Sequence, residues 1–190
     1  MPKTTQFDRL ELIAFFRAVD ARLSGPGTLR LLGGAAIGLC HLPVFQTRDI
    51  DYSWADPQVQ AAITAVQPDW PGVPVQRTGV YFAPYSHEER LEVVEIPGLR
   101  RLTVQVPERH DLAIMKLARG FDRDLDAVEQ MHRAEPLHLD TLVERFAETW
   151  ITGPQRLADI GFFSVIETLF GEQAADAAEA QLHERRRSGD

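Results

Sequence analysis

The sequence predicts an α+β fold, with a mixed sheet and flanking helices in residues 1–106 and a helical region in residues 107–190 that packs on this core. Two observations predict this order. Strand-like and helix-like segments alternate up to residue 106, and from Pro107 onward the apolar residues recur at helical spacing. Strands gathered in one part of a chain and helices in the other are typical of α+β proteins rather than of a doubly wound parallel sheet.

In the first part, apolar spacing and turn residues define each element. Phe7, Leu10 and Ile13 recur at helical spacing and predict a helix over residues 5–23, which the turn Ser24-Gly25-Pro26-Gly27 ends. The elements expected after it are a strand at 28–32, a short helix at 35–41, a strand at 48–53, a helix at 56–66 and three strands at 75–83, 89–96 and 100–106.

In the second part, the apolar pattern predicts five helices in succession. Gly120, Pro136 and the pair Gly153-Pro154 separate them, because these residues interrupt helices. The expected helices cover residues 107–119, 122–134, 138–150, 154–170 and 172–187. We therefore expect a small helical bundle after the sheet.

The composition is that of a globular protein. The 190 residues are 44% hydrophobic and 25% charged, with a formal net charge of −8, which excludes wholesale disorder and fibrous repeats. An acidic balance argues against broad, nonspecific wrapping of nucleic acid, although it leaves room for a local basic site. Cys40 is the only cysteine, and no apolar run approaches the roughly 20 residues of a membrane span. We therefore expect a cytoplasmic protein without a membrane partner.

The most informative stretch joins two glycines to two aspartates. Gly33 and Gly34 end the expected strand at 28–32 and begin a helix, an arrangement that lets a phosphate approach the backbone and a helix N-terminus. Asp49 and Asp51 follow on the next strand, where alternation points both carboxylates to the same side. Two adjacent carboxylates repel each other unless a cation lies between them, and hard oxygen ligands suit Mg²⁺ carried in by a nucleoside triphosphate.

Each half of this pattern also has an ordinary structural explanation. A Gly-Gly turn is common in proteins, and an Asp-x-Asp pair on an edge strand can simply face solvent. The combination of strand, glycine pair, helix and Asp49-Ile50-Asp51 at this spacing favours a function.

The combined pattern resembles the nucleotidyltransferase signature of the polymerase-β-like superfamily. Within that superfamily it is similar to the small bacterial nucleotidyltransferases related to the AbiEii and MenT toxins of toxin–antitoxin systems. The motifs that carry the likeness are Gly33-Gly34-Ala35-Ala36, Asp49-Ile50-Asp51, Lys116 and Arg123-Asp124. One position departs from the family pattern, because Ala127 stands where a further aspartate is usual.

The resemblance implies a Mg²⁺-dependent enzyme that transfers a nucleoside monophosphate from a nucleoside triphosphate (NTP) to a hydroxyl group. The acceptor would be a tRNA or a protein, with a small molecule such as an aminoglycoside as the alternative, and an antitoxin would be the partner. The alternative is a catalytically idle nucleotidyltransferase fold that serves as a nucleotide-binding or protein-interaction module. Under the first hypothesis, Asp49 and Asp51 hold the metal, and Gly33 and Gly34 cradle the phosphates.

A two-metal site for phosphoryl transfer usually has a third carboxylate on a neighbouring strand. The segment Arg90-Leu91-Glu92-Val93 matches the family pattern of basic, apolar, acidic and apolar residues. Glu92 is therefore our candidate for the third metal ligand and for the general base. Glu95 is the other acid of this strand, and alternation puts it on the opposite face.

The helix expected after Pro107 carries a basic stripe that includes Lys116 and Arg119. By resemblance, Lys116 holds the nucleotide phosphates and assists catalysis, helped by Arg119. On the next helix Asp124 projects from the apolar side, where a carboxylate needs a partner, and either of these two bases can supply it. The basic stripe can instead simply face solvent, and Asp124 can instead cap its helix. The candidate nucleotide-binding residues are thus Gly33, Gly34, Lys116, Arg119 and Asp124.

Overall fold

The computed structural model describes residues 6–72, 74–80, 82–117 and 122–188, and its chain divides into two compact units. The first unit consists of residues 1–79 and 91–107, and the second of residues 80–90 and 108–190. The first contains a mixed sheet with flanking helices and the second is mainly helical, so the predicted α+β class is confirmed. No helix of the described ranges combines the length and the apolar composition needed to span a bilayer.

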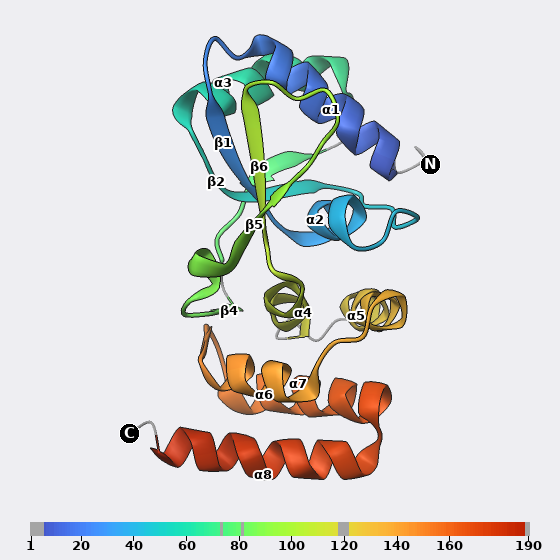
Figure 1. Cartoon of the computed structure of the whole chain (residues 1–190), viewed down its shortest axis with the longest axis vertical. Helices are drawn as coiled ribbons and strands as arrows, with labels where there is room; N and C mark the ends of the chain where they lie inside the picture. The colour runs from blue at the N-terminus through green and yellow to red at the C-terminus, as the bar shows by residue number, and fades with distance from the viewer. Residues whose placement is uncertain (1–5, 73, 81, 118–121, 189–190) are drawn as a thin grey trace. The chain divides into compact units, whose positions relative to one another are not determined.

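The first unit is built on a five-stranded sheet of order β3-β2-β1-β6-β5 (Figure 1). Its strands are β1 (Gly27–Leu31), β2 (Ile50–Ala55), β3 (Val75–Arg77), β5 (Leu91–Val94) and β6 (Leu102–Pro107). The central strand β1 is antiparallel to β2 and parallel to β6. At the edges, β3 is parallel to β2 and β5 is antiparallel to β6.

Three α-helices belong to this unit: α1 (Arg9–Arg22), α2 (Gly33–Cys40) and α3 (Pro57–Val66). The first begins later than the expected residue 5 because Asp8 caps it. The Asp8 carboxylate accepts from the backbone N–H groups of Leu10 and Glu11, and the Glu11 side chain accepts from the Asp8 N–H. This reciprocal arrangement is a capping box, which sets the start of a helix.

The two faces of the sheet differ in character. Leu29, Leu31, Val104 and Val106 are buried, and the strand register puts them on one face, where α1 packs on β6 and α3 on β1 (Figure 1). The opposite face carries a more polar row in which Arg30 pairs with Trp54 across β1 and β2, and the Arg30 guanidinium lies 5.2 Å from the centre of the Trp54 ring. The hydrophobic stabilisation of this unit therefore comes mainly from one side of its sheet.

A buried carboxylate joins α1 to the start of β6. Asp20 Oδ1 accepts hydrogen bonds from the backbone N–H groups of Arg100 (3.0 Å), Arg101 (2.7 Å) and Leu102 (2.7 Å). Burial by itself raises the pKa of Asp20, but these three donors outweigh it, and the net pKa lies below its usual value. The anion thus satisfies three backbone donors where the chain enters β6.

The second unit contains two strands and five α-helices in the described residues. Its elements are β4 (Phe82–Pro84), α4 (Arg109–Leu117), α5 (Asp122–Ala134), α6 (Leu139–Ala147), β7 (Thr149–Ile151), α7 (Gln155–Phe170) and α8 (Glu172–Ser188). Helices α7 and α8 form an antiparallel hairpin across Gly171, and α6 packs on α8 (Figure 1). At the core the rings of Phe146 and Phe162 are stacked 4.0 Å apart.

The strand pairing of residues 80–90 differs from the one expected. The expected strand at 75–83 is split, because β3 pairs with β2 in the first unit whereas β4 pairs antiparallel with β7 in the second. The helix expected at 138–150 correspondingly ends at Ala147, and Thr149-Trp150-Ile151 forms β7. Branched and aromatic side chains of this kind favour strands once a partner strand is present. The boundary expected after residue 106 therefore leaves out a segment that belongs to the second unit.

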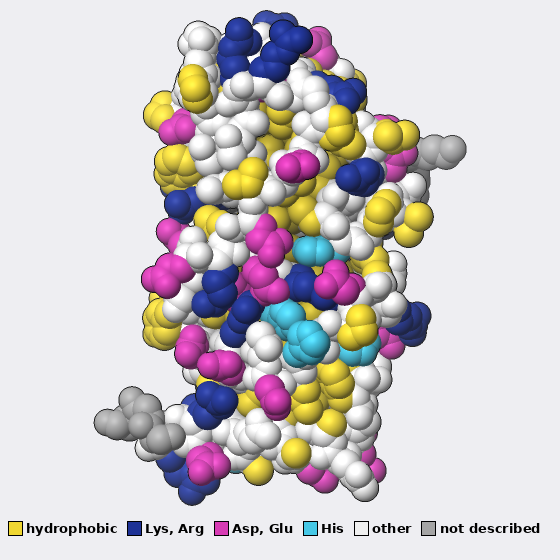
Figure 2. Space-filling view, in the orientation of Figure 1, with side chains coloured by type: hydrophobic (Ala, Val, Ile, Leu, Met, Phe, Trp, Pro, Cys, Tyr) yellow, Lys and Arg dark blue, Asp and Glu magenta, His cyan; other side chains and the backbone are white. Residues whose placement is uncertain are grey.

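An ionic network surrounds the start of α4. Arg90 donates two hydrogen bonds to Asp111, at 2.9 and 3.0 Å, and Arg145 bonds to both Asp111 and Glu108. His110 Nδ1 lies 2.7 Å from Glu108 Oε1. The surface view in Figure 2 shows how closely basic, acidic and histidine side chains are interspersed on one face of the molecule. Since the Asp111 side chain is fully buried, these ion pairs compensate for its loss of hydration.

Replacing Asp20 tests the joint between α1 and β6. We expect Asp20→Ala to lower the free energy of unfolding by about 2–4 kcal/mol, because three backbone N–H groups, that of Leu102 buried, lose a charged acceptor. Asp20→Asn keeps an acceptor oxygen without the charge and should lie between wild type and Asp20→Ala. Urea unfolding monitored by circular dichroism measures both values. Equal stability of all three proteins would contradict the role given to Asp20.

The pKa of Glu108 predicts acid sensitivity. Burial raises this pKa, but the hydrogen bond and charge of His110, followed by those of Arg145, lower it from 4.5 to about 2. A lowered pKa stabilises the folded state above pH 4.5, and this contribution is lost as the pH falls from 4.5 toward 2. We expect the wild type to lose about 2–3 kcal/mol more than Glu108→Gln across this range. Urea unfolding at a series of pH values measures the difference, with the exposed Glu144→Gln as control. A difference that does not change with pH would contradict this account.

Candidate functional site

The glycine turn between β1 and α2 lies against Asp51. Gly33 has φ +63°, a left-handed conformation that glycine adopts without strain. A Cβ atom at Gly33 would lie 3.4 Å from Asp51 Oδ2. The backbone continues the contact, since the N–H of Leu32 donates to the carbonyl oxygen of Asp51 at 2.8 Å. The turn and the first carboxylate of β2 thus form one local structure.

Gly34 faces Thr47 at still closer range. A Cβ atom at Gly34 would lie 2.5 Å from Thr47 Oγ1, which is too close for any side chain. The buried Thr47 hydroxyl in turn donates to Asp49, with its carbonyl oxygen at 3.0 Å and Oδ1 at 3.3 Å. The Thr47 backbone is paired with Phe7 through two hydrogen bonds of 2.7 and 3.0 Å. Thr47 therefore connects the N-terminal segment, the glycine turn and Asp49.

Asp51 is held from the neighbouring edge strand. The parallel register of β2 and β3 pairs Asp51 with Gln76, and Gln76 Nε2 donates to Asp51 Oδ1 at 3.0 Å. Alternation along β2 puts Asp51 on the face away from Ile50 and Tyr52, which are buried in the core, and Asp49 directly precedes the strand. The Asp51 carboxylate consequently projects away from the core of the unit.

Sequence reasoning did not identify Thr47 or Gln76 as site residues. A weak signal existed for Thr47, because threonine hydroxyls commonly bond to the backbone two residues further along the chain. The sequence contains no such signal for Gln76, because its contact with Asp51 depends on which strands are neighbours.

Glu92 lies in a different part of the sheet from Asp51, and its expected role as a third metal ligand stays a prediction. It lies on β5, and β1 and β6 lie between this strand and β2. The register pairs Glu92 with Val106, on the face of the buried Val104, whereas Asp51 projects from the other face. Among the described residues, no three His, Cys, Asp or Glu side chains form a group that could hold a metal ion. The strand that neighbours β2 on this side is β3, and it presents Gln76 to Asp51.

The chemistry of the remaining donors fits a hard divalent cation better than a soft one. Asp49 and Asp51 offer carboxylate oxygens, the ligand type that Mg²⁺ prefers, and the missing Cβ of Gly33 leaves room beside Asp51 Oδ2. Burial, followed by the charge of Glu92, raises the pKa of the Cys40 thiol to about 12, so this sulfur stays protonated. A protonated thiol is neither a nucleophile nor a metal ligand.

Lys116 and Asp124 belong to the second unit, where they form a buried ion pair. Lys116 Nζ lies 2.9 Å from Asp124 Oδ1, and the two residues are 8% and 1% exposed. The structure thus gives Asp124 one of the two partners expected for it. The other, Arg119, lies outside the described residues. The expected contact of Lys116 with nucleotide phosphates stays a prediction.

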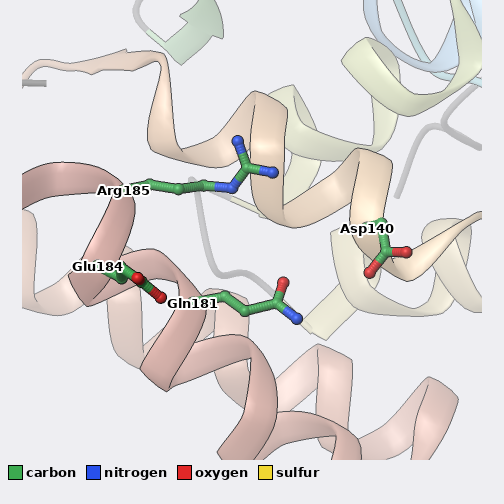
Figure 3. A pocket seen from close by; sticks show the side chains of 4 residues that line it. All are labelled: Asp140, Gln181, Glu184 and Arg185. Atoms are coloured by element: carbon green, nitrogen blue, oxygen red, sulfur yellow. The ribbon is translucent and has the colours of Figure 1, made fainter. Parts of the chain in front are cut away.

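A hollow of about 490 Å³ also lies within the second unit, between α6 and α8 (Figure 3). Its lining consists of Asp140, Gln181, Glu184 and Arg185. These side chains are mostly exposed and of mixed charge, so they favour no class of ligand. The candidate site therefore remains the glycine turn with Asp49 and Asp51.

Comparison with known proteins found a family model that covers most of the chain. A family model described as a nucleotidyltransferase of unknown function (DUF6036) matches residues 11–166, a range that includes the glycine turn, both aspartates and Lys116. No match was found among curated proteins or among solved structures.

The contact between Gly34 and Thr47 can be tested by a double-mutant cycle. We expect Gly34→Ala to destabilise the protein by about 1–3 kcal/mol, because the new methyl group overlaps Thr47 Oγ1. In a Thr47→Ala background the same change should cost less, since the overlapping oxygen is gone. Urea unfolding measures the four proteins, with Gly25→Ala as control because nothing lies within 4 Å of a Cβ there. Strictly additive effects would contradict the close contact.

Proposed function

The chain belongs to the DUF6036 family of nucleotidyltransferases of unknown function, and from this premise we propose that it is a Mg²⁺-dependent enzyme that transfers a nucleoside monophosphate from an NTP to a hydroxyl group. One observation carries the proposal beyond the family assignment. The left-handed Gly33 turn brings the start of α2 against Asp51, and Thr47, which faces Gly34, donates a hydrogen bond to Asp49. These contacts support a site formed by the backbone N–H groups of the turn and the two carboxylates.

The two kinds of group suit the two parts of a metal–nucleotide complex. The first N–H groups of a helix and its positive dipole end attract phosphate oxygens, and the glycines let those oxygens come close. Asp49 and Asp51 would hold the cation, which supplies charge compensation for the phosphates when bound. Thr47 and Gln76 keep the two carboxylates in place before the substrate arrives. Such positioning and electrostatic stabilisation are the main contributions in phosphoryl transfer.

In the proposed reaction, the acceptor oxygen attacks the α-phosphorus of the NTP and forms a new phosphate ester. The bond from the α-phosphorus to the oxygen that bridges to the β-phosphate breaks, and pyrophosphate leaves with the electron pair. The proton of the acceptor hydroxyl passes to solvent water. Reactant and product atoms therefore balance without a redox partner.

The identity of the acceptor is the finer part of the proposal. A tRNA or protein hydroxyl, as in AbiEii- and MenT-like toxins, is supported by the motifs Asp49-Ile50-Asp51, Lys116 and Arg123-Asp124. An antitoxin partner is proposed on the same resemblance. The family model carries the nucleotidyltransferase assignment but not this subgroup.

One observation favours the second hypothesis, a catalytically idle nucleotide-binding module. The neighbouring strand presents the amide of Gln76 to Asp51 where a third carboxylate would strengthen metal binding. A module of this kind would bind NTP and Mg²⁺ without transferring the nucleotide, so binding and transfer have to be measured separately.

Label transfer from NTPs tests the proposed activity. The full chain is incubated with each of the four α-³²P-labelled NTPs, Mg²⁺ and either total RNA or a cell lysate. We expect labelling by at least one NTP, and a loss of about 10³-fold or more in Asp49→Ala and Asp51→Ala, because the metal ligands are removed. Glu95→Gln is the matched control, an exposed acid of the same unit.

Two outcomes separate the hypotheses. Nucleotide binding without label transfer from any NTP to either mixture would favour the idle module. Transfer that survives both aspartate substitutions would contradict the site itself. Circular dichroism of each variant establishes that it is folded.

A further inference from the structure

We infer that Gln76 is a positioning residue, which orients Asp51 toward a single divalent ion that arrives with the nucleotide. A carboxylate at position 76 would be a third metal ligand, and the site would then bind cations without a nucleotide. This inference rests on the proposed function. It names the way in which this chain's own residues prepare the cation site.

The register of the sheet is the first observation. Strand β3 pairs with β2 through Ile50 with Val75, Asp51 with Gln76, and Tyr52 with Arg77. Side chains at paired positions project from the same face of a sheet, so residue 76 lies beside Asp51. On its other side β2 is bordered by β1, whose continuation at Leu32 contacts the backbone of Asp51 rather than its carboxylate. Position 76 is therefore the one from which the edge strand reaches this carboxylate.

The hydrogen bond is the second observation. Gln76 Nε2 lies 3.0 Å from Asp51 Oδ1, and an ionised carboxylate only accepts hydrogen bonds, so the amide must present its NH₂ group. The other oxygen, Oδ2, lies on the side of Gly33, 3.4 Å from the position of a Cβ there. The hydrogen bond holds Oδ1 toward β3, and Oδ2 lies on the side of the glycine turn, where phosphates are proposed to bind.

The third observation is that the glutamine side chain carries no charge. A carboxylate at position 76 would bring a third negative charge to Asp49 and Asp51, and such a cluster attracts cations even without a substrate. An amide orients Asp51 without this added attraction. The arrangement therefore suits an ion whose remaining ligands come from the triphosphate.

Substitutions at position 76 are expected to separate orientation from charge. Gln76→Leu keeps the size but removes the donor, and should weaken Mn²⁺ binding in the presence of nucleotide by about 10- to 100-fold, as is typical when a group that orients a metal ligand is lost. Gln76→Glu should instead strengthen Mn²⁺ binding in the absence of nucleotide by about tenfold or more, because a third carboxylate is added.

The measurement is Mn²⁺ binding to the full chain, followed by the electron paramagnetic resonance signal of free Mn²⁺, with and without a non-hydrolysable NTP analogue. Wild type should bind one ion per chain tightly only with the analogue present, after subtraction of Mn²⁺ bound to the analogue alone. Gln130→Leu, on the exposed surface of α5, is the matched control and should behave as wild type. Thermal unfolding midpoints show whether each variant is folded.

Several results would overturn the inference. Unchanged Mn²⁺ binding in Gln76→Leu would show that the amide does not position Asp51, and two ions bound tightly to nucleotide-free wild type would show that the site needs no substrate ligands. If Gln76→Leu fails to fold, Gln76→Glu decides, because unaltered nucleotide-free binding in that variant would also refute the inference. Asp51→Asn separates failure of the proposed function from failure of this inference. If Asp51→Asn binds Mn²⁺ as wild type does, the proposed metal site is wrong. If Asp51→Asn loses Mn²⁺ binding but Gln76→Leu does not, only the role of Gln76 is refuted.

Discussion

The close approach of the glycine turn to the start of β2 is the contact on which the rest of the first unit depends. A side chain at Gly34 would overlap Thr47, and one at Gly33 would combine a left-handed backbone with a contact to Asp51. Because neither position has a Cβ atom, α2 can begin directly beside the two aspartates. Thr47 extends the arrangement to the N-terminal segment through its backbone pairing with Phe7. Local backbone geometry thus determines where phosphate-binding and cation-binding groups can meet.

The first unit uses the two faces of its sheet for different purposes. Helices cover the face of Leu29 and Val104, and apolar residues of both the helices and the sheet are buried there. Asp51 projects from β2 away from the buried Ile50 and Tyr52, Asp49 directly precedes this strand, and neither aspartate is buried in the core. This separation lets the site carry two adjacent carboxylates without the large cost of burying unpaired charge. Glu92, by contrast, is paired with Val106 on the helix-covered face.

The second unit handles buried charge differently, by pairing it. Asp111 is fully buried and bonded to Arg90 and Arg145, and Asp124 is bonded to Lys116. Removing one member of such a pair leaves an uncompensated charge, which is far more costly than replacing both. Both pairs involve residues of α4, so this helix is the ionic centre of its unit. Lys116, which the sequence pattern singled out, thus has a structural partner in Asp124.

The sequence by itself determined the α+β class, the glycine turn and the aspartate pair, because these depend on local rules: apolar periodicity, the backbone freedom of glycine and side-chain alternation along one strand. The five C-terminal helices followed from the same periodicity. Only the tertiary structure decided which strands are neighbours. The sequence pattern pointed to Glu92 as the third group, whereas the sheet order brings Gln76 to Asp51, and the long-range pairing of β4 with β7 moves residues 80–90 into the second unit. The physical reason is that strand pairing joins residues far apart in the chain, and no local pattern records which partner a strand will choose.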